Sequence, residues 1–198
     1  MKSIKSILIN IGKHIWVYVI FCLTFSLLSI YIVNLINKPR NQETISIFVA
    51  SYDYKCEVFR KEVDKNRPDY LREIEFHTYS LLDNSFDDYY LNLAYGLCDI
   101  AILPESKVND SKVQDYYAIL SDEIINEYYT DNEFYTLDEK DYGVLIHKKG
   151  LNDNNLLKYS LSEEMDENYY LFFFWKSKHI GSLNNTTYET AFKLMQVF

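Results

Sequence analysis

Residues with the types and spacing of a catalytic or metal site are scarce in this chain of 198 residues. The histidines show no metal-binding spacing, and the sequence contains no HExxH or paired-cysteine motif. The five glycines are too scattered to build a P-loop, a GxGxxG turn or a GxSxG turn. We therefore expect no metal ion, no cofactor and no enzymatic activity.

Three tracts rich in Asp, Asn and Glu, at 130–133, 152–155 and 162–168, raise the alternative of a calcium site. Asp153 and Asn155 of the second tract are followed by Leu157, where a third oxygen ligand belongs, and no glycine occupies the turn. Solvated loops are the better interpretation of these tracts.

A binding site is better supported, because polar and aromatic residues follow three predicted strands. These residues are Ser51, Tyr52, Asp53, Tyr79, Ser80, Glu105 and Ser106. Tyr52 is suited to stack on a ring, and Asp53 and Glu105 are suited to accept hydrogen bonds from hydroxyls or amines. The alternative is that Asp53 caps a helix and that the others are ordinary loop residues.

The three strands that must position these residues are predicted at 45–50, 73–79 and 99–103. Helical patterns at 53–68 and 85–96 lie between them, the second opened by a capping box at Ser85. This β-α-β-α-β order predicts parallel strands with right-handed crossovers. The alternating second strand belongs at an edge and the two apolar strands belong inside, so the predicted order is second, first, third, the doubly wound arrangement.

The sequence pattern after residue 106 predicts further elements of an α/β fold. Ser121 is expected to cap a helix, 142–147 and 169–175 read as strands, and 148–168 reads as a connector. A capping box at Thr186 and Glu189 is expected to start the last helix. The predicted class is therefore one three-layer, doubly wound α/β lobe with a mostly parallel sheet.

An apolar run precedes this lobe. Residues 15–36 carry no charge, and at about 1.5 Å per residue they reach roughly 33 Å, enough to cross a bilayer core. The alternatives are a buried core helix and a cleaved signal peptide, but the run is longer than usual for either and no cleavage site follows. We expect a transmembrane helix at 15–37, a cytoplasmic N-terminus at 1–14, a stalk at 38–44 and an extracytoplasmic domain at 45–198.

The charge distribution restricts the partners. Residues 41–198 hold all 29 acidic residues against 15 basic ones, whereas the preceding residues hold no acid. A lobe of this charge is a poor surface for a phosphate backbone, which argues against nucleic-acid binding. The excess of basic residues on the N-terminal side of the span is small, and a long acidic domain translocates largely regardless of it. The expected localisation is the cell membrane, with the lobe outside.

The three cysteines do not form a disulfide framework. Cys22 lies in the span, and Cys56 and Cys98 are predicted at opposite ends of the sheet, too far apart for a disulfide. We expect both to be free, buried thiols, as in a bacterial surface protein.

Four stretches resemble the extracellular solute-binding proteins of ABC transporters, which have the type 2 periplasmic-binding fold. These stretches are ISIFVASY at 45–52, CDIAILPES at 98–106, YGVLIH at 142–147 and YYLFFFWKSKHIG at 169–181. In that family a whole second lobe separates the last two stretches, whereas here only about 20 residues do. The resemblance therefore implies a single lobe without an opposing one.

A lone lobe makes only half the contacts of a two-lobed binding protein and leaves its ligand exposed to water. The resemblance thus implies a membrane-anchored, non-catalytic lobe that binds a small solute weakly or associates with an ABC permease or another membrane protein. The alternatives are a membrane-tethered structural or sensory module without a solute ligand, and a truncated remnant of a binding protein.

Overall fold

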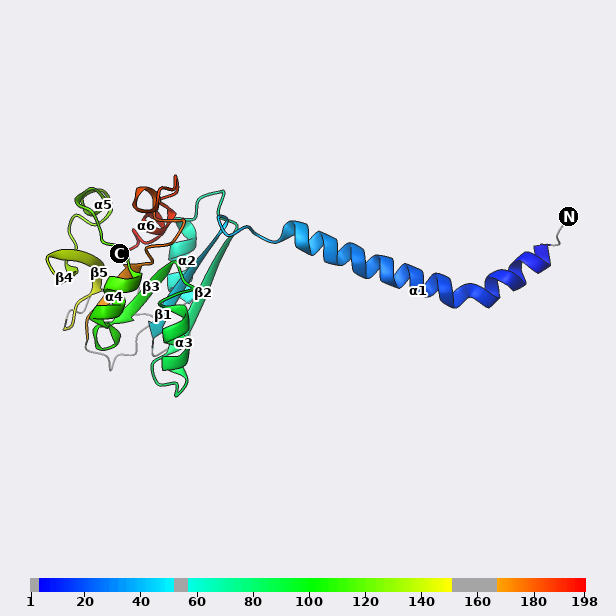
Figure 1. Cartoon of the computed structure of the whole chain (residues 1–198), viewed down its shortest axis with the longest axis horizontal. Helices are drawn as coiled ribbons and strands as arrows, with labels where there is room; N and C mark the ends of the chain where they lie inside the picture. The colour runs from blue at the N-terminus through cyan, green and yellow to red at the C-terminus, as the bar shows by residue number, and fades with distance from the viewer. Residues whose placement is uncertain (1–3, 52–56, 151–166) are drawn as a thin grey trace. The chain divides into compact units, whose positions relative to one another are not determined.

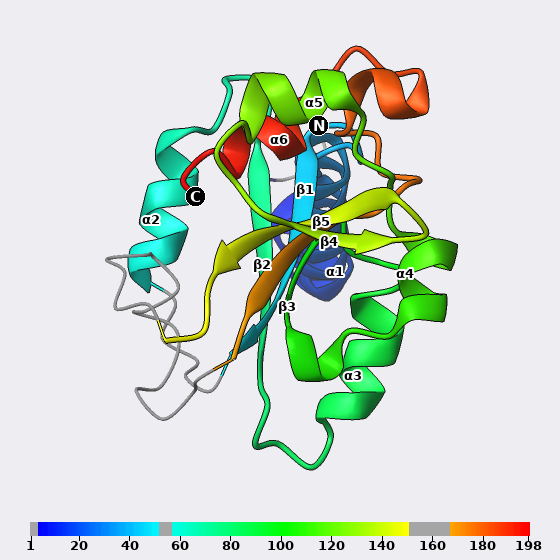
Figure 2. The ribbon, with the colours of Figure 1, turned by 90° about the vertical axis from the view of Figure 1, so that its left-hand side faces the viewer.

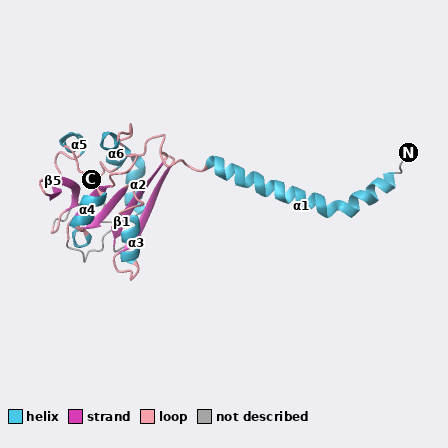
Figure 3. Ribbon diagram, in the orientation of Figure 1, coloured by secondary structure: helices cyan, strands magenta, loops and turns pink. Residues whose placement is uncertain are grey.

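The fold is taken from a computed structural model, which describes residues 4–51, 57–150 and 167–198. The chain divides into two compact units, Met1–Pro39 and Arg40–Phe198. The elements (Figures 1 and 3) are, in chain order, α1 (Ile4–Asn37), β1 (Thr44–Ser51), α2 (Glu57–Lys65), β2 (Glu73–Ser80), α3 (Phe86–Leu93), β3 (Ile100–Pro104), η1 (Glu105–Lys107), α4 (Asp110–Tyr116), α5 (Asp122–Tyr128), β4 (Phe134–Leu137), β5 (Lys140–His147), β6 (Tyr169–Phe173), η3 (Gly181–Asn184) and α6 (Thr190–Leu194).

The first unit is the helix α1. Its segment His14–Asn37 has 24 residues and a mean hydropathy of 2.4 in its most apolar window, and none of that window is buried. This segment is long and apolar enough to cross a membrane. An N-terminal helix of this kind is compatible with a membrane anchor or with a signal sequence.

The second unit contains one six-stranded sheet in the order β2-β1-β3-β6-β5-β4. β1 pairs in parallel with β2 and with β3, which confirms the predicted order of the first three strands. β6 runs antiparallel to β3 and to β5, and β4 runs antiparallel to β5. The sheet is therefore mixed, with four of its six strands pointing the same way.

Helices cover both faces of this sheet, so the predicted three-layer arrangement is confirmed (Figure 2). On one face, Ile47 and Val49 of β1 pack in a cluster with residues of α2, α5 and α6. On the other face, Phe48 and Ala50 pack with residues of α3 and α4. Because side chains alternate along a strand, β1, which is buried from Ile45 to Ser51, contributes to both cores.

Two predicted caps are wrong in detail. Ser85 precedes α3, but its side chain makes no capping hydrogen bond, and its backbone N–H donates to Asp83 Oδ1 instead. The last helix begins at Thr190 rather than near Thr186, whose hydroxyl donates to the carbonyl of Gly181. The Ser121 cap is confirmed, because its hydroxyl oxygen accepts from the backbone N–H of Ile124.

The structure also contains elements that the sequence pattern did not predict. These are α4, capped by the side chain of Asn109, and the edge strand β4, which forms a hairpin with β5. The strand predicted at 169–175 ends at Phe173, so Trp175 lies beyond the sheet.

A glycine in β5 tests the packing between the strands. A Cβ at Gly143 would lie 2.5 Å from the ring of Phe172, which is fully buried. We predict that Gly143→Ala lowers the free energy of unfolding by about 1–3 kcal/mol, because a buried ring must shift. Denaturant unfolding, followed by near-ultraviolet circular dichroism, measures this change.

Gly96→Ala is the matched control. A Cβ there meets only the carbonyl oxygen of Asn92, at an ordinary 3.5 Å. Its effect should stay within about 0.5 kcal/mol. Equal unfolding midpoints for the two variants would contradict the tight approach of β5 to Phe172.

Candidate functional site

The carboxyl edge of the sheet is the end where β1, β2 and β3 finish. Ser51 and Ser80 are register partners at the ends of β1 and β2, and Glu105 follows directly after β3. The structure therefore brings Ser51, Tyr79, Ser80, Glu105 and Ser106 to one edge, as the sequence predicts. Tyr52 and Asp53 lie outside the described residues.

The two serines at this edge are buried, with 0% of Ser51 and 6% of Ser80 exposed. The carbonyl of Ser51 accepts a hydrogen bond from Leu81 N–H at 2.9 Å, and the Ser80 hydroxyl oxygen accepts one from Leu82 N–H at 3.2 Å. These contacts shape the turn that follows β2.

Tyr79 provides an aromatic surface at the same edge. Its ring stacks on Tyr89 of α3 with centroids 4.4 Å apart, and on Phe48 of β1 at 5.7 Å. Partial burial, with a smaller contribution from Tyr89, raises the pKa of the Tyr79 phenol above its ordinary value. At neutral pH this side chain is therefore an uncharged hydrogen-bonding group on an aromatic platform.

Glu105 and Ser106 contact the chain that leads into β6. The Glu105 backbone N–H donates to the Asn168 carbonyl, and its carboxylate accepts from the Asn168 side-chain amide, both at 2.9 Å. The Ser106 backbone N–H donates to Glu167 Oε2 at 3.0 Å. The carboxylates of Glu105 and Glu167 are thus both held next to the segment that follows β3, and a carboxylate can accept hydrogen bonds from hydroxyls or amines.

Phenols pack beneath this edge, against α3. Tyr90 hydrogen-bonds to Tyr95 and to the carbonyl of Lys107, and the Tyr117 hydroxyl donates to the carbonyl of Ala94 at 2.8 Å. Burial raises the pKa of all three phenols, so none of them ionises near neutral pH. Tyr90 and Tyr95 thus link α3 to the segment that follows β3.

Among the residues that the structure describes, no cluster of three or more His, Cys, Asp or Glu side chains has the arrangement of a metal site. The second and third acidic tracts considered for calcium lie largely or wholly outside the described residues.

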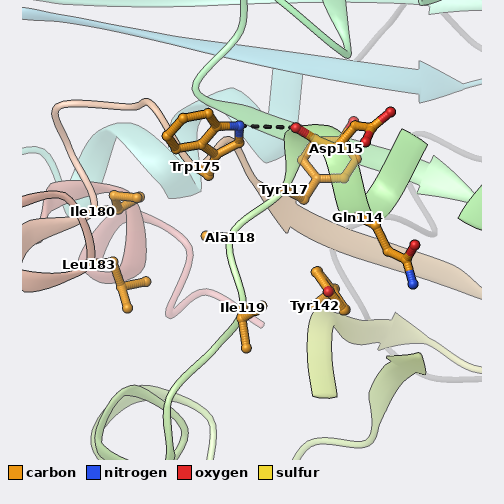
Figure 4. Close-up of a pocket in the computed structure, with 9 residues that line it drawn as sticks. All are labelled: Gln114, Asp115, Tyr117, Ala118, Ile119, Tyr142, Trp175, Ile180 and Leu183. Carbon is orange, nitrogen blue, oxygen red and sulfur yellow. Dashed lines mark hydrogen bonds between the residues drawn. The ribbon is translucent and has the colours of Figure 1, made fainter. Parts of the chain in front are cut away.

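A hollow of about 520 Å³ lies at the opposite end of the sheet, which we call the amino edge, where β1, β3 and β5 begin and β6 ends (Figure 4). Its lining residues are Gln114, Asp115, Tyr117, Ala118, Ile119, Tyr142, Trp175, Ile180 and Leu183. The indole of Trp175 is held in place by a hydrogen bond from Nε1 to the carbonyl of Asp115 at 3.0 Å. Trp175 is nevertheless 44% exposed.

The sequence pattern does not predict this hollow, because the apolar strand expected at 169–175 includes Trp175. The sequence feature that could have revealed it is the pair Lys176 and Lys178, which follow the tryptophan closely and are both exposed. A buried strand seldom continues into alternating lysines, so the change of pattern marks the end of β6.

Beside the hollow, the carboxylate of Asp99 joins three segments. One oxygen accepts from the backbone N–H of Ser46 at 2.9 Å, and the other accepts from the Ser177 hydroxyl at 2.7 Å. His179, only 1% exposed, contacts the carbonyl of Thr44 through Nε2 at 2.9 Å. All of these hydrogen bonds are internal to the fold, which makes the cluster a structural one.

Cys98 precedes β3 at the amino edge and is a free, buried cysteine, as the sequence predicts, whereas Cys56 lies outside the described residues. Burial, assisted by the neighbouring Asp99 carboxylate, raises the pKa of the Cys98 thiol from 9.0 to about 12. A thiol with this pKa contains about a thousandth of the thiolate of an ordinary cysteine at pH 8.

We therefore predict that a variant with Cys98 as its sole cysteine (Cys22→Ser, Cys56→Ser) reacts at pH 8 at least about 100-fold more slowly with a thiol reagent when folded than in urea. The raised pKa stabilises the fold fully below pH 9, and this contribution is lost as the pH rises towards 12. Equal labelling rates in the folded and unfolded states would contradict the burial of this thiol.

Comparison with known proteins adds no functional assignment to this geometry. No protein-family model matches the sequence, and no curated protein matches it.

Proposed function

We propose that this protein is a single-pass membrane protein with a cytoplasmic N-terminus, which presents a non-catalytic binding lobe outside the membrane. The lobe contacts a small solute weakly, or a transporter-like membrane protein such as an ABC permease, at its carboxyl edge. In this proposal it acts as one half of a solute-binding protein of the type 2 periplasmic-binding fold.

The observation that supports this proposal best is the parallel arrangement β2-β1-β3, with a helix from each crossover on opposite faces of the sheet. In open α/β sheets, ligands bind beyond the carboxyl ends of the strands at the point where the strand order reverses. That point lies between β1 and β3, next to Glu105 and near the Tyr79 ring.

The chemistry of this edge favours hydroxyl- or amine-bearing solutes. Glu105 and Glu167 supply acceptors, and Tyr79 and Tyr89 supply a stacked aromatic surface. The basic Lys107 is engaged, because its Nζ pairs with Asp87 at 2.9 Å and lies over the ring of Phe86. Because a single lobe encloses a ligand from one side only, we expect weak binding.

A second candidate is a membrane-tethered structural or sensory module that contacts other proteins and binds no solute. The internal hydrogen bonds of Glu105 and Ser106 favour it, since a ligand would have to replace or share these contacts with Asn168 and Glu167.

A thermal-shift screen of the full chain in detergent separates the two candidates. A solute at a hundred times its dissociation constant stabilises the folded state by about 2.7 kcal/mol. For a lobe of this size we predict that a polyhydroxyl or amine solute raises the melting temperature by roughly 5–10 °C.

The variant Glu105→Gln should reduce this shift, whereas the matched control Glu123→Gln, exposed on α5, should leave it unchanged. If no sugar, amino acid or polyamine shifts the melting temperature, solute binding is refuted and the interaction module is favoured. A shift that Glu105→Gln does not alter would place the solute somewhere other than the carboxyl edge.

A further inference from the structure

The amino edge of the lobe exposes large apolar side chains that are not part of the buried core. Leu97 is 71% exposed, and Ile119 and Trp175 are each 44% exposed. The segments that carry them are joined, because Trp175 N–H donates to the Tyr116 carbonyl and Phe174 N–H donates to the Asp99 carbonyl. Ile119 and Trp175 line the hollow of Figure 4, and Leu97 lies two residues before Asp99 in the segment that bonds to Phe174.

Two basic residues follow Trp175 in the chain. Lys176 and Lys178 are both exposed, and neither forms an ion pair with any residue that the structure describes. Lys176 lies with its Nζ over the Trp175 ring, 4.7 Å from the ring centroid. In a lobe with 29 acidic and 15 basic residues, this combination is unusual.

The chain that leads to the membrane helix also leaves from this edge. Residues 40–43 form a turn in which Glu43 N–H donates to the Arg40 carbonyl at 2.7 Å. The carbonyl of Glu43 accepts from Arg72 N–H at 2.7 Å, which fixes this turn to the start of β2. The connection between the end of α1 and the folded turn is therefore only Lys38 and Pro39.

This short connection restricts where the amino edge can go. The three Cα–Cα steps from Asn37 to Arg40 span at most about 11 Å. If α1 spans a bilayer, the amino edge is held near the membrane surface at a high effective concentration. Trp and Lys are the residues suited to that surface, since the indole prefers the headgroup level and the ammonium contacts lipid phosphates.

We propose that the amino edge is a lipid-contact surface, in which Trp175, Ile119 and Leu97 lie at the headgroup level of the bilayer while Lys176 and Lys178 contact lipid phosphates. This proposal rests on the membrane anchor proposed above. A lipid surface is favoured over a protein partner because the two-residue connection keeps Arg40, where the chain enters this edge, within about 11 Å of the end of α1.

The two tryptophans of the chain, Trp16 and Trp175, allow a direct test on the full protein. The variant Trp16→Phe, reconstituted in nanodiscs, leaves Trp175 as the only indole. Acyl chains brominated near the headgroup should lower its fluorescence about twofold relative to unbrominated lipid, because bromine quenches an indole at this depth. Nanodiscs that contain phosphatidylglycerol should give stronger quenching than those of phosphatidylcholine alone.

Charge variants test the role of the lysines. Lys176→Gln with Lys178→Gln should remove the additional quenching caused by phosphatidylglycerol. The matched control, Lys148→Gln with Lys149→Gln, changes two exposed lysines after β5 at the other end of the strand and should leave that quenching intact. Equal effects of the two pairs would overturn the assignment to Lys176 and Lys178.

The companion variant Trp175→Phe reports on the anchor alone, through Trp16. Quenching of Trp16 without quenching of Trp175 would overturn the lipid-contact surface and leave the anchor standing. No quenching of either residue would overturn both. Protection of Trp175 from acrylamide without quenching by brominated lipid would show a protein on this surface and would also overturn the proposal.

Discussion

At the amino edge, the carboxylate of Asp99 links β1 to the segment that follows β6. Its oxygens accept from the backbone N–H and hydroxyl of Ser46 and from the hydroxyl of Ser177. Its backbone bonds to the same segments, with N–H donating to Ser46 and the carbonyl accepting from Phe174. Hydrogen bonds to a charged acceptor are stronger than neutral ones, and the loss of a partly buried acceptor leaves several donors unsatisfied.

The carboxyl edge and the amino edge both depend on this junction. Asp99 precedes β3, which joins the parallel strands β2 and β1 to the antiparallel strands β6, β5 and β4. At one end of β3, the register with β1 brings Glu105 to the edge that carries Ser51 and Ser80. At the other end, the contact with Ser177 fixes the segment that carries Trp175. The lobe therefore has an acidic, aromatic edge and, at the opposite end of the same strands, an apolar edge. Lys176 and Lys178 at the apolar edge form no ion pair with any residue that the structure describes.

A structural feature could be predicted from the sequence when its pattern extended over a whole strand. The order of β2, β1 and β3 followed from strict alternation at 73–79 and uniform apolarity at 45–50, two properties of whole strands. β4 was missed because it is short and half-buried, and because Asp138 and Glu139 adopt positive φ in a turn without glycine. At the carboxyl edge, the sequence located the residues but could not show that Glu105 and Ser106 contact Asn168 and Glu167, which lie some 60 residues away.

Protease accessibility tests whether α1 anchors the lobe on the outer side of a membrane, as we propose, in intact cells that express the full chain with a C-terminal epitope. We expect external protease to remove the epitope from intact cells while a cytoplasmic marker survives, and we expect the chain to sediment with the membranes before digestion. An epitope that is protected until the membrane is lysed, or a chain released into the medium without α1, would contradict this proposal.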